Sequence, residues 1–188
     1  MNEYFSDKFK VLIVDDEEGP RRAIEAALYR EKNLEIKTAK SGEEALGYFD
    51  SELYDLVLTD IRMPQMDGID LLRKIHERSP NTLVILITGY GTLNSAIDAI
   101  RAGAYDYLTK PFKVEELCIV VERAIEKIRL LRENERLLGE LKALFEKVKQ
   151  NMVQTETAEK GVRNLELLQE VRKQLSQIFV RNGGNGTG

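Results

Sequence analysis

One aspartate follows a run of residues that is typical of a buried strand. Residues 53–68 read LYDLVLTDIRMPQMDG, and the apolar run 56–58 ends in Thr59 and Asp60 before a loop that contains proline. A carboxylate at this place can act as a nucleophile or as a metal ligand. It can equally begin a loop or cap a turn, as aspartate often does. The other polar residues of the chain have to decide between these interpretations.

Five short apolar runs alternate with helical patterns over residues 10–127, and this alternation predicts the framework that holds Asp60. The strands are expected at 10–14, 34–37, 55–59, 83–87 and 105–108. The helices are expected at 18–31, 42–51, 68–78 and 92–102, with a fifth after Pro111. The fold class is therefore α/β: a five-stranded, parallel, doubly wound sheet of the flavodoxin-like order 2-1-3-4-5. The more polar second and fifth strands should form its edges.

Four more polar residues follow the ends of predicted strands: Asp15, Asp16, Thr88 and Lys110. Since the carboxyl ends of parallel strands meet at one edge of a sheet, these side chains should gather around Asp60. Three crowded carboxylates repel one another and favour a divalent cation, and a site of oxygen ligands favours Mg²⁺. Beside such an ion a carboxylate can attack phosphorus and form an aspartyl phosphate.

In this chemistry Lys110 and Thr88 would each contact an oxygen of the phosphoryl group. Taken singly, each residue has a plainer interpretation. The acidic residues 15–18 can favour the start of a helix, Lys110 can be a solvated charge, and Thr88 can belong to a turn. Because all of these plain interpretations must hold together at corresponding strand ends, the joint pattern favours the phosphoacceptor site.

Four motifs carry a resemblance to a known family: VLIVDDE at 11–17, LTDIRMPQMDG at 58–68, ITGYG at 87–91 and AGAYDYLTKPF at 102–112. Residues 8–127 resemble the receiver domains of two-component response regulators. The last two motifs most resemble the receivers of nitrogen-regulation-type activators. The resemblance implies that Asp60 accepts phosphate from a phosphohistidine on a sensor histidine kinase.

The same resemblance assigns the remaining site residues. It implies that Asp15 and Asp16 hold Mg²⁺, with Asp16 the more direct ligand, and that Asp60 and the backbone carbonyl of Arg62 complete the protein ligands. It also implies that the Lys110–Pro111 peptide bond is cis. Thr88 and Tyr107 match the switch residues of the family, in which the aromatic ring turns inward when the hydroxyl moves toward the phosphoryl group.

Composition limits the remaining possibilities. The 188-residue chain has a formal net charge of −4 and a pI near 5.3, so it has no overall basic field for nonspecific nucleic-acid binding. The single cysteine, Cys118, excludes an intramolecular disulfide and is expected in the core. No apolar stretch is typical of a signal peptide or a membrane span, so we expect a cytoplasmic protein. No G-x-x-x-x-G-K-[ST] motif for nucleotide binding is present.

Residues 128–181 have the composition of a coiled coil that continues the fifth helix. Heptads counted from Leu117 place these residues at alternating a and d positions: Leu131, Asn134, Leu138, Leu141, Phe145, Val148, Met152 and Thr155. The pattern fails around 155–161, and a second frame contains Leu168, Val171, Leu175 and Ile178. We expect a homodimer in which Asn134 constrains register. A helical hairpin and a solvated single helix are the alternatives, and the glycine-rich tail 182–188 is expected to be disordered.

Two classes of function follow for the whole chain. In the first, phosphorylation switches the receiver surface, and the helical extension passes the change to a partner protein or to a downstream domain. In the second, the receiver is a scaffold for dimerisation that does not depend on phosphorylation. The set of acidic residues with Thr88 and Lys110 favours the first class, because a scaffold has no need of crowded carboxylates. In neither class is the chain an enzyme, beyond a slow self-dephosphorylation.

Overall fold

The computed structural model describes residues 8–29, 31–89, 93–154, 169 and 172–173. It divides into two compact units, Met1–Leu131 and Arg132–Gly188, which are described separately. The sequence pattern predicts the end of the receiver slightly earlier, after residue 127. Thr155, the interruption at 155–161, the second heptad frame and the tail 182–188 lie outside the described residues.

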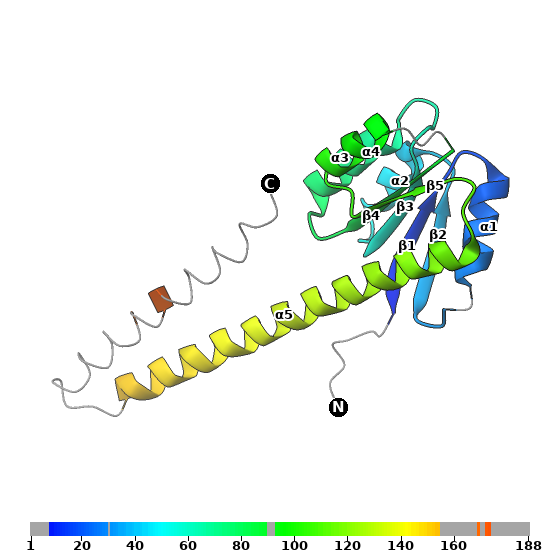
Figure 1. Ribbon diagram of the computed structural model, residues 1–188. Coiled ribbons are helices and arrows are strands. Elements are labelled where there is room, and N and C mark those ends of the chain that lie inside the picture. The colour runs from blue at the N-terminus through cyan, green and yellow to red at the C-terminus, as the bar shows by residue number, and fades with distance from the viewer. Residues whose placement is uncertain (1–7, 30, 90–92, 155–168, 170–171, 174–188) are drawn as a thin grey trace. The chain divides into compact units, whose positions relative to one another are not determined.

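Strands and helices alternate through the first unit (Figure 1). The strands are β1 (Phe9–Val14), β2 (Leu34–Ala39), β3 (Leu56–Asp60), β4 (Leu83–Thr88) and β5 (Asp106–Thr109). The helices are α1 (Glu18–Leu28), α2 (Gly42–Tyr48), α3 (Gly68–Arg78), α4 (Leu93–Arg101) and α5 (Val114–Gln154). The predicted long helix after residue 113 is present, since α5 has 41 residues.

The five strands form one parallel sheet in the order β2-β1-β3-β4-β5, which confirms the predicted fold class. β2 and β5, the two more polar strands, lie at the edges as expected. β3 lies at the centre, between β1 and β4, and all five of its residues are buried. The carboxyl ends of β1, β3 and β4 therefore lie next to one another at one edge of the sheet.

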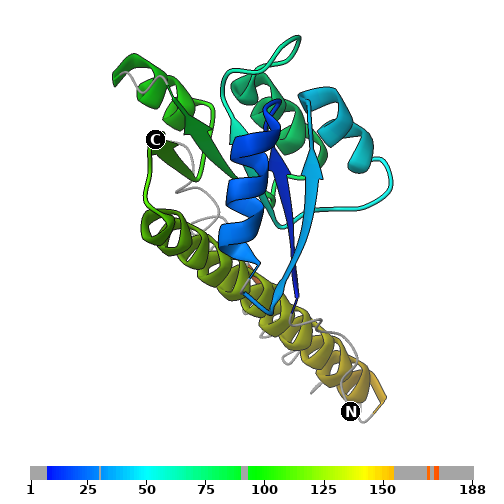
Figure 2. The ribbon, with the colours of Figure 1, turned by 90° about the vertical axis from the view of Figure 1, so that its right-hand side faces the viewer.

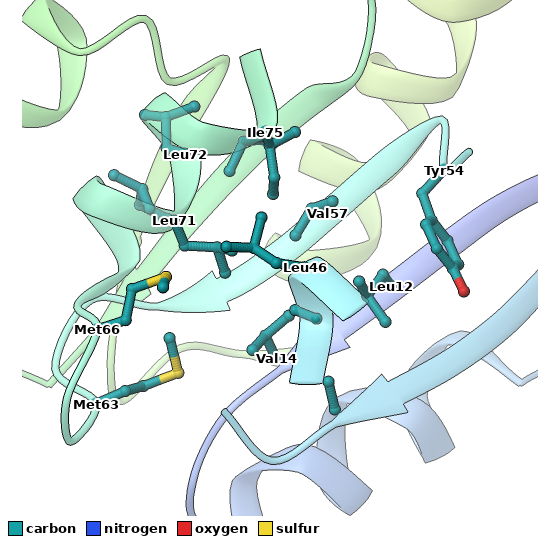
Figure 3. Close-up of a cluster of buried hydrophobic side chains, with 14 of the residues drawn as sticks. Leu12, Val14, Leu46, Tyr54, Val57, Met63, Met66, Leu71, Leu72 and Ile75 are labelled. Carbon is teal, nitrogen blue, oxygen red and sulfur yellow. The ribbon is translucent and has the colours of Figure 1, made fainter. Parts of the chain in front are cut away.

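Successive residues of the central strands pack into two separate cores. Leu12 and Val57 contact the core on the side of α2, α3 and α4 (Figure 3). Leu86 belongs to the same core. The alternate residues Ile13 and Leu58 contact the core on the side of α1 and the first turns of α5. Figures 1 and 2 show these two helical layers on opposite faces of the sheet. Burial on both faces explains why the central strands read as continuous Val, Ile and Leu runs.

Two helices end earlier than predicted, and in each case tight turns continue beyond the helix. After α2, three backbone amides in a row, those of Phe49, Asp50 and Ser51, donate to carbonyls three residues earlier. After α1, the Glu31 amide donates to the Leu28 carbonyl at 3.0 Å. Hydrogen bonds between residues three apart are typical of the tight turns that follow an α-helix. The helical sequence pattern therefore extends beyond the residue at which each α-helix ends.

No helix within the described part of the chain has both the length and the apolar character that crossing a membrane would require.

Candidate functional site

Asp60 is the last residue of β3, and its two carboxylate oxygens have different partners. Its Oδ2 accepts a hydrogen bond from the Arg62 backbone amide at 2.7 Å, so Asp60 does stabilise the turn that follows it. Its Oδ1 lies 2.8 Å from Nζ of Lys110, which donates to it. Asp60 is only 8% exposed. The turn interpretation is therefore correct for one oxygen, and the other oxygen belongs to a charged cluster.

Asp15, just beyond the end of β1, repeats this arrangement. Its Oδ1 accepts from the Glu17 backbone amide at 2.9 Å, and its Oδ2 accepts from Lys110 Nζ at 2.8 Å. The residue is 2% exposed. Each carboxylate thus uses one oxygen to order its own loop and directs the other toward the same ammonium group. The cluster Asp15–Lys110–Asp60 carries two negative charges and one positive charge.

Lys110 is held by its backbone as well as by its side chain. Its amide donates to the Thr88 carbonyl at 2.7 Å, and the Lys110–Pro111 peptide bond is cis, as the family resemblance implied. Burial lowers the pKa of Lys110, but hydrogen bonds and charge interactions with Asp15 and Asp60 outweigh burial and leave this pKa raised. The amine is therefore a cation throughout the physiological range.

Asp16 does not share the burial of Asp15. It is exposed, whereas its neighbour in sequence is almost inaccessible to solvent. Within the part of the chain that the structure describes, no three His, Cys, Asp or Glu side chains form a group that could hold a metal ion by themselves. The structure thus brings two of the three predicted carboxylates together through Lys110. The roles of Asp16 and of the Arg62 carbonyl as metal ligands stay predictions.

The available donors nevertheless suit a hard cation. Asp15 and Asp60 are carboxylates at the edge of the sheet, and the ion Mg²⁺ is typically held by one or two carboxylates while it keeps several waters. The two described groups that accept hydrogen bonds from Lys110 Nζ are carboxylates rather than thiols or imidazoles. Asp15 and Asp60, with Asp16 and the Arg62 carbonyl nearby in sequence, are the residues that would hold Mg²⁺.

Thr88 and Tyr107 occupy neighbouring strands next to the cluster. Thr88 is the last residue of β4 and is 1% exposed, and β4 pairs with β3 so that Ile87 faces Asp60 across the ladder. Tyr107 lies on β5, half-buried against the core on the α3 and α4 side. It pairs with Leu86, two residues before Thr88. The two predicted switch residues thus lie on adjacent strands of one sheet.

Two residues near the cluster have a role that the sequence analysis did not assign. Gly68 begins α3, and a Cβ atom there would lie 2.2 Å from the backbone oxygen of Asp60. The Gly68 amide also donates to the Ile61 carbonyl at 2.9 Å. Arg21 donates from Nη1 to the Asp15 carbonyl at 2.6 Å. The glycine after Asp67 was the only sequence signal for the close approach of α3 to Asp60.

Residues 11–122 match the model of the response regulator receiver domain. The chain belongs to this family. The receiver fold accounts for the sheet with helices on both faces and for the position of the acidic cluster at the carboxyl edge of the sheet.

Its relatives include regulators of the nitrogen-regulation type. The chain is 42% identical over 117 residues to the regulatory protein AtoC of Escherichia coli, covering 62% of this chain and 25% of AtoC. It is 40% identical over 122 residues to the DNA-binding transcriptional regulator NtrC of Proteus hauseri, covering 65% of this chain and 26% of NtrC. The chain thus matches only about a quarter of the length of these regulators.

Solved structures of receiver-containing proteins also match this chain. NtrX from Brucella abortus, in complex with ADP, matches with a TM-score of 0.64 and 34% identity, over 76% of this chain and 34% of NtrX. A CheY-like receiver domain protein from Methanospirillum hungatei matches with a TM-score of 0.61 and 30% identity, over 65% of this chain and 97% of that protein. The receiver therefore resembles both isolated receivers and those of larger regulators.

Proposed function

We propose that the protein is a phosphorylation switch in which Asp60 accepts a phosphoryl group from a sensor histidine kinase. The observation that carries this proposal is the shared position of the Lys110 ammonium, 2.8 Å from an oxygen of Asp15 and 2.8 Å from an oxygen of Asp60. Membership of the receiver family supports the same assignment.

The transfer would proceed by attack of Asp60 Oδ1 on the phosphorus of a phosphohistidine. An O–P bond forms, the P–N bond breaks, and its electron pair returns to the imidazole nitrogen of the kinase. Bound Mg²⁺ would offset the negative charges that otherwise keep the carboxylate and the phosphoryl group apart. The second oxygen of Asp60 stays bonded to the Arg62 amide, which fixes the direction of the attacking oxygen.

Lys110 would move from the carboxylates to the new phosphoryl oxygens. In the described state it neutralises one of two negative charges, and the incoming group adds more negative charge at the same place. The hydroxyl of Thr88 would donate to another phosphoryl oxygen, and Tyr107 would then turn toward the space it leaves. This repacking of β4 and β5 would change the surface of the receiver that a partner contacts.

The extension and the location belong to the same proposal. The protein would lie in the cytoplasm and form a homodimer through the C-terminal helix. Its receiver would take the signal from the kinase and pass it to a partner protein or a downstream domain.

NtrC, a relative, is described as a DNA-binding transcriptional regulator, but this chain has no overall basic field for direct nucleic-acid binding. Turnover of an independent substrate is not part of the function; water attack on the acyl phosphate would only reset the switch.

Phosphorylation by a small-molecule donor tests the proposal. With Mg²⁺ and a small acyl phosphate, the full chain should gain one hydroxylamine-labile phosphoryl group by intact-mass measurement, and Asp60→Asn should gain none. Asp67→Asn is the matched control, because this carboxylate lies in the same loop and caps α3, and asparagine caps helices equally well. Retained phosphorylation in Asp60→Asn would contradict the proposal. A wild-type chain that gains no phosphoryl group would favour the scaffold.

A further inference from the structure

Asp15 is held through its backbone as well as through its carboxylate. Its amide donates to the Ala39 carbonyl of β2 at 3.2 Å, and its carboxylate accepts from the Glu17 amide and from Lys110. Its carbonyl accepts from Arg21 Nη1 at 2.6 Å. Because Asp15 is 2% exposed, its carbonyl would have little access to water if this donor were lost. The bond from Arg21 is thus the contact that fixes the backbone of Asp15 on the side of α1.

Arg21 bonds to both ends of the connection between β1 and α1. It lies in the first turn of α1, and its own amide donates to the Glu17 carbonyl at 3.3 Å. Its guanidinium reaches six residues back to Asp15. The four residues 15–18 are all acidic, and like charges this close repel one another. A cationic side chain that bonds to the backbone of this segment therefore opposes its opening.

The charge of Arg21 has an acidic counterpart outside the site. Glu44, in the first turn of α2, accepts hydrogen bonds from the Lys40 amide and the Tyr48 hydroxyl, each at 2.8 Å. These two bonds, followed by the charges of Lys40 and Arg21, lower the pKa of Glu44 and outweigh its burial. The guanidinium therefore lies in the field of a fixed carboxylate on α2 while it bonds to the backbone of Asp15.

The neighbouring arginine has a different arrangement. Arg22 Nη2 lies 2.6 Å from Glu18 Oε1, and both side chains are largely exposed, at 75% and 64%. Exposed pairs of this kind contribute little to stability. Arg21, by contrast, is half-buried and bonds to a buried residue. The two arginines carry the same charge at the start of α1, so Arg22 is a matched control for Arg21.

We propose that Arg21 is a positioning residue, which holds the backbone at Asp15 so that Asp15 and Asp16 meet Mg²⁺ in an ordered loop. The inference rests on the phosphoacceptor proposal, because that proposal places Mg²⁺ at these carboxylates. Groups that orient metal ligands raise metal affinity by roughly 10–100-fold, since an ordered site loses less freedom when the ion binds. Arg21 would thus contribute to ion binding without touching the ion.

The sign of the effect separates positioning from charge. Removal of the Arg21 charge alone would strengthen Mg²⁺ binding, because one cation near the site would be lost. Removal of its bond to Asp15 would weaken binding, because the ion would then have to order the loop. We expect the loss of order to prevail, since Glu44 already offsets part of the Arg21 charge and salt screens the rest. A role in stability alone would leave the Mg²⁺ affinity of the folded protein unchanged.

Titration of the full chain with MgCl₂, followed through backbone amide NMR shifts, measures the affinity. Arg21→Ala should bind Mg²⁺ about tenfold more weakly than wild type, whereas Arg22→Ala should stay within about twofold of it. Arg21→Lys keeps the charge and one donor on a shorter side chain, so its affinity should fall between those of wild type and Arg21→Ala. Equal or tighter binding by folded Arg21→Ala would overturn the inference. If Arg21→Ala does not fold, Arg21→Lys decides, and an affinity equal to that of wild type would overturn the inference.

Hydrogen exchange in the metal-free protein gives a second measurement. The Glu17 amide, which donates to Asp15 Oδ1, should exchange about tenfold faster in Arg21→Ala, while the Leu58 amide of β3 reports any general loss of stability. Unchanged exchange at Glu17, or an equal increase at Leu58, would contradict a local role for Arg21. A wild-type chain that binds no Mg²⁺ would instead overturn the phosphoacceptor proposal, and the inference with it. The behaviour of the wild type thus distinguishes the two failures.

Discussion

β1 has a charged cluster near each end, and the two clusters have opposite compositions. Near its amino end, the Glu52 carboxylate lies between two ammonium groups, 2.8 Å from Lys10 and 2.8 Å from Lys37. Beyond its carboxyl end, the Lys110 ammonium lies between two carboxylates at the same distances. Of the three groups named in each cluster, the first set carries two positive charges and one negative charge, and the second carries one positive and two negative. Glu35 and Asp55 also interact with Lys10 at the amino end.

This difference separates a structural cluster from a reactive one. Glu52 also accepts a hydrogen bond from the Tyr54 hydroxyl at 2.5 Å, so both of its oxygens are used within the protein. Asp15 and Asp60 share one cation and are more deeply buried, which leaves a net negative charge that a bound cation can offset. The same ion-pair geometry therefore stabilises one end of the strand and leaves the other end able to bind a cation.

Removing the shared cation should have the largest effect. In Lys110→Met, two buried carboxylates face each other without their partner, so we expect a loss of about 3 kcal/mol in the free energy of unfolding at pH 7. Mg²⁺ should restore part of this loss, because it can replace the missing positive charge, while phosphorylation of Asp60 stays impaired. Urea denaturation with and without MgCl₂ measures both effects. An unchanged stability would show that Lys110 does not hold the carboxylates together.

Crowding the backbone behind Asp60 should have the next largest effect. In Gly68→Ala the new methyl group would meet the Asp60 carbonyl at 2.2 Å, and backbone at that distance has to move. We expect a loss of about 2 kcal/mol, together with slower phosphorylation, since the reactive carboxylate moves with its backbone. Gly139→Ala is the control: nothing lies within 4 Å of that site in α5, and alanine favours helix by up to about 1 kcal/mol. Equal stability changes in the two variants would contradict the close approach.

The sequence predicted the charged cluster at the carboxyl end of β1 better than the cluster at its amino end. Asp15, Asp60, Thr88 and Lys110 could be found because each follows a Val, Ile and Leu run, or a motif, and parallel strands bring such ends together. Glu52 lies in the connection between α2 and β3, where no periodic pattern indicates its partners. Its contacts with Lys10 and Lys37 depend on the register of β1 and β2, which local sequence does not specify.

Details within the reactive site were also beyond prediction. Asp15 and Asp16 are adjacent aspartates with the same chemistry, and both follow the end of β1 at Val14, yet one is buried and the other exposed. The Asp15 amide still donates to the Ala39 carbonyl of β2 at 3.2 Å, which holds Asp15 against the sheet. The approach of Gly68 to Asp60 depends on the angle at which α3 begins after its loop. Such backbone angles follow from the packing of α3 on the sheet rather than from any single residue.

The cluster around Glu52 should contribute to the loss of folding stability at acid pH. Hydrogen bonds from Lys10, Lys37 and Tyr54 lower the pKa of Glu52 from its usual value to about 2. A carboxyl group with a lowered pKa stabilises the fold above its unfolded pKa, near 4.5, and this contribution is lost as the pH falls toward about 2. Glu52→Gln should therefore reduce the slope of stability against pH in that window. Urea denaturation at a series of acid pH values measures the slope of stability against pH, and the exposed Glu43→Gln variant is the control. Equal slopes in wild type and Glu52→Gln would show that Glu52 does not contribute to the loss of stability at acid pH.

The smallest effect should come from the phenol that completes the structural cluster. Tyr54 is 4% exposed, and its ring packs against Phe49 with centroids 5.3 Å apart, so Tyr54→Phe keeps the packing and removes one hydrogen bond to Glu52. We expect a loss of about 1 kcal/mol at pH 7. Burial, followed by the bond to Glu52, raises the pKa of Tyr54 to about 12, so its contribution is present below pH 10 and is lost as the pH rises toward 12. The difference between wild type and Tyr54→Phe in urea denaturation should therefore shrink above pH 10. A difference that stays constant up to pH 12 would show that the phenol proton is not what Glu52 binds.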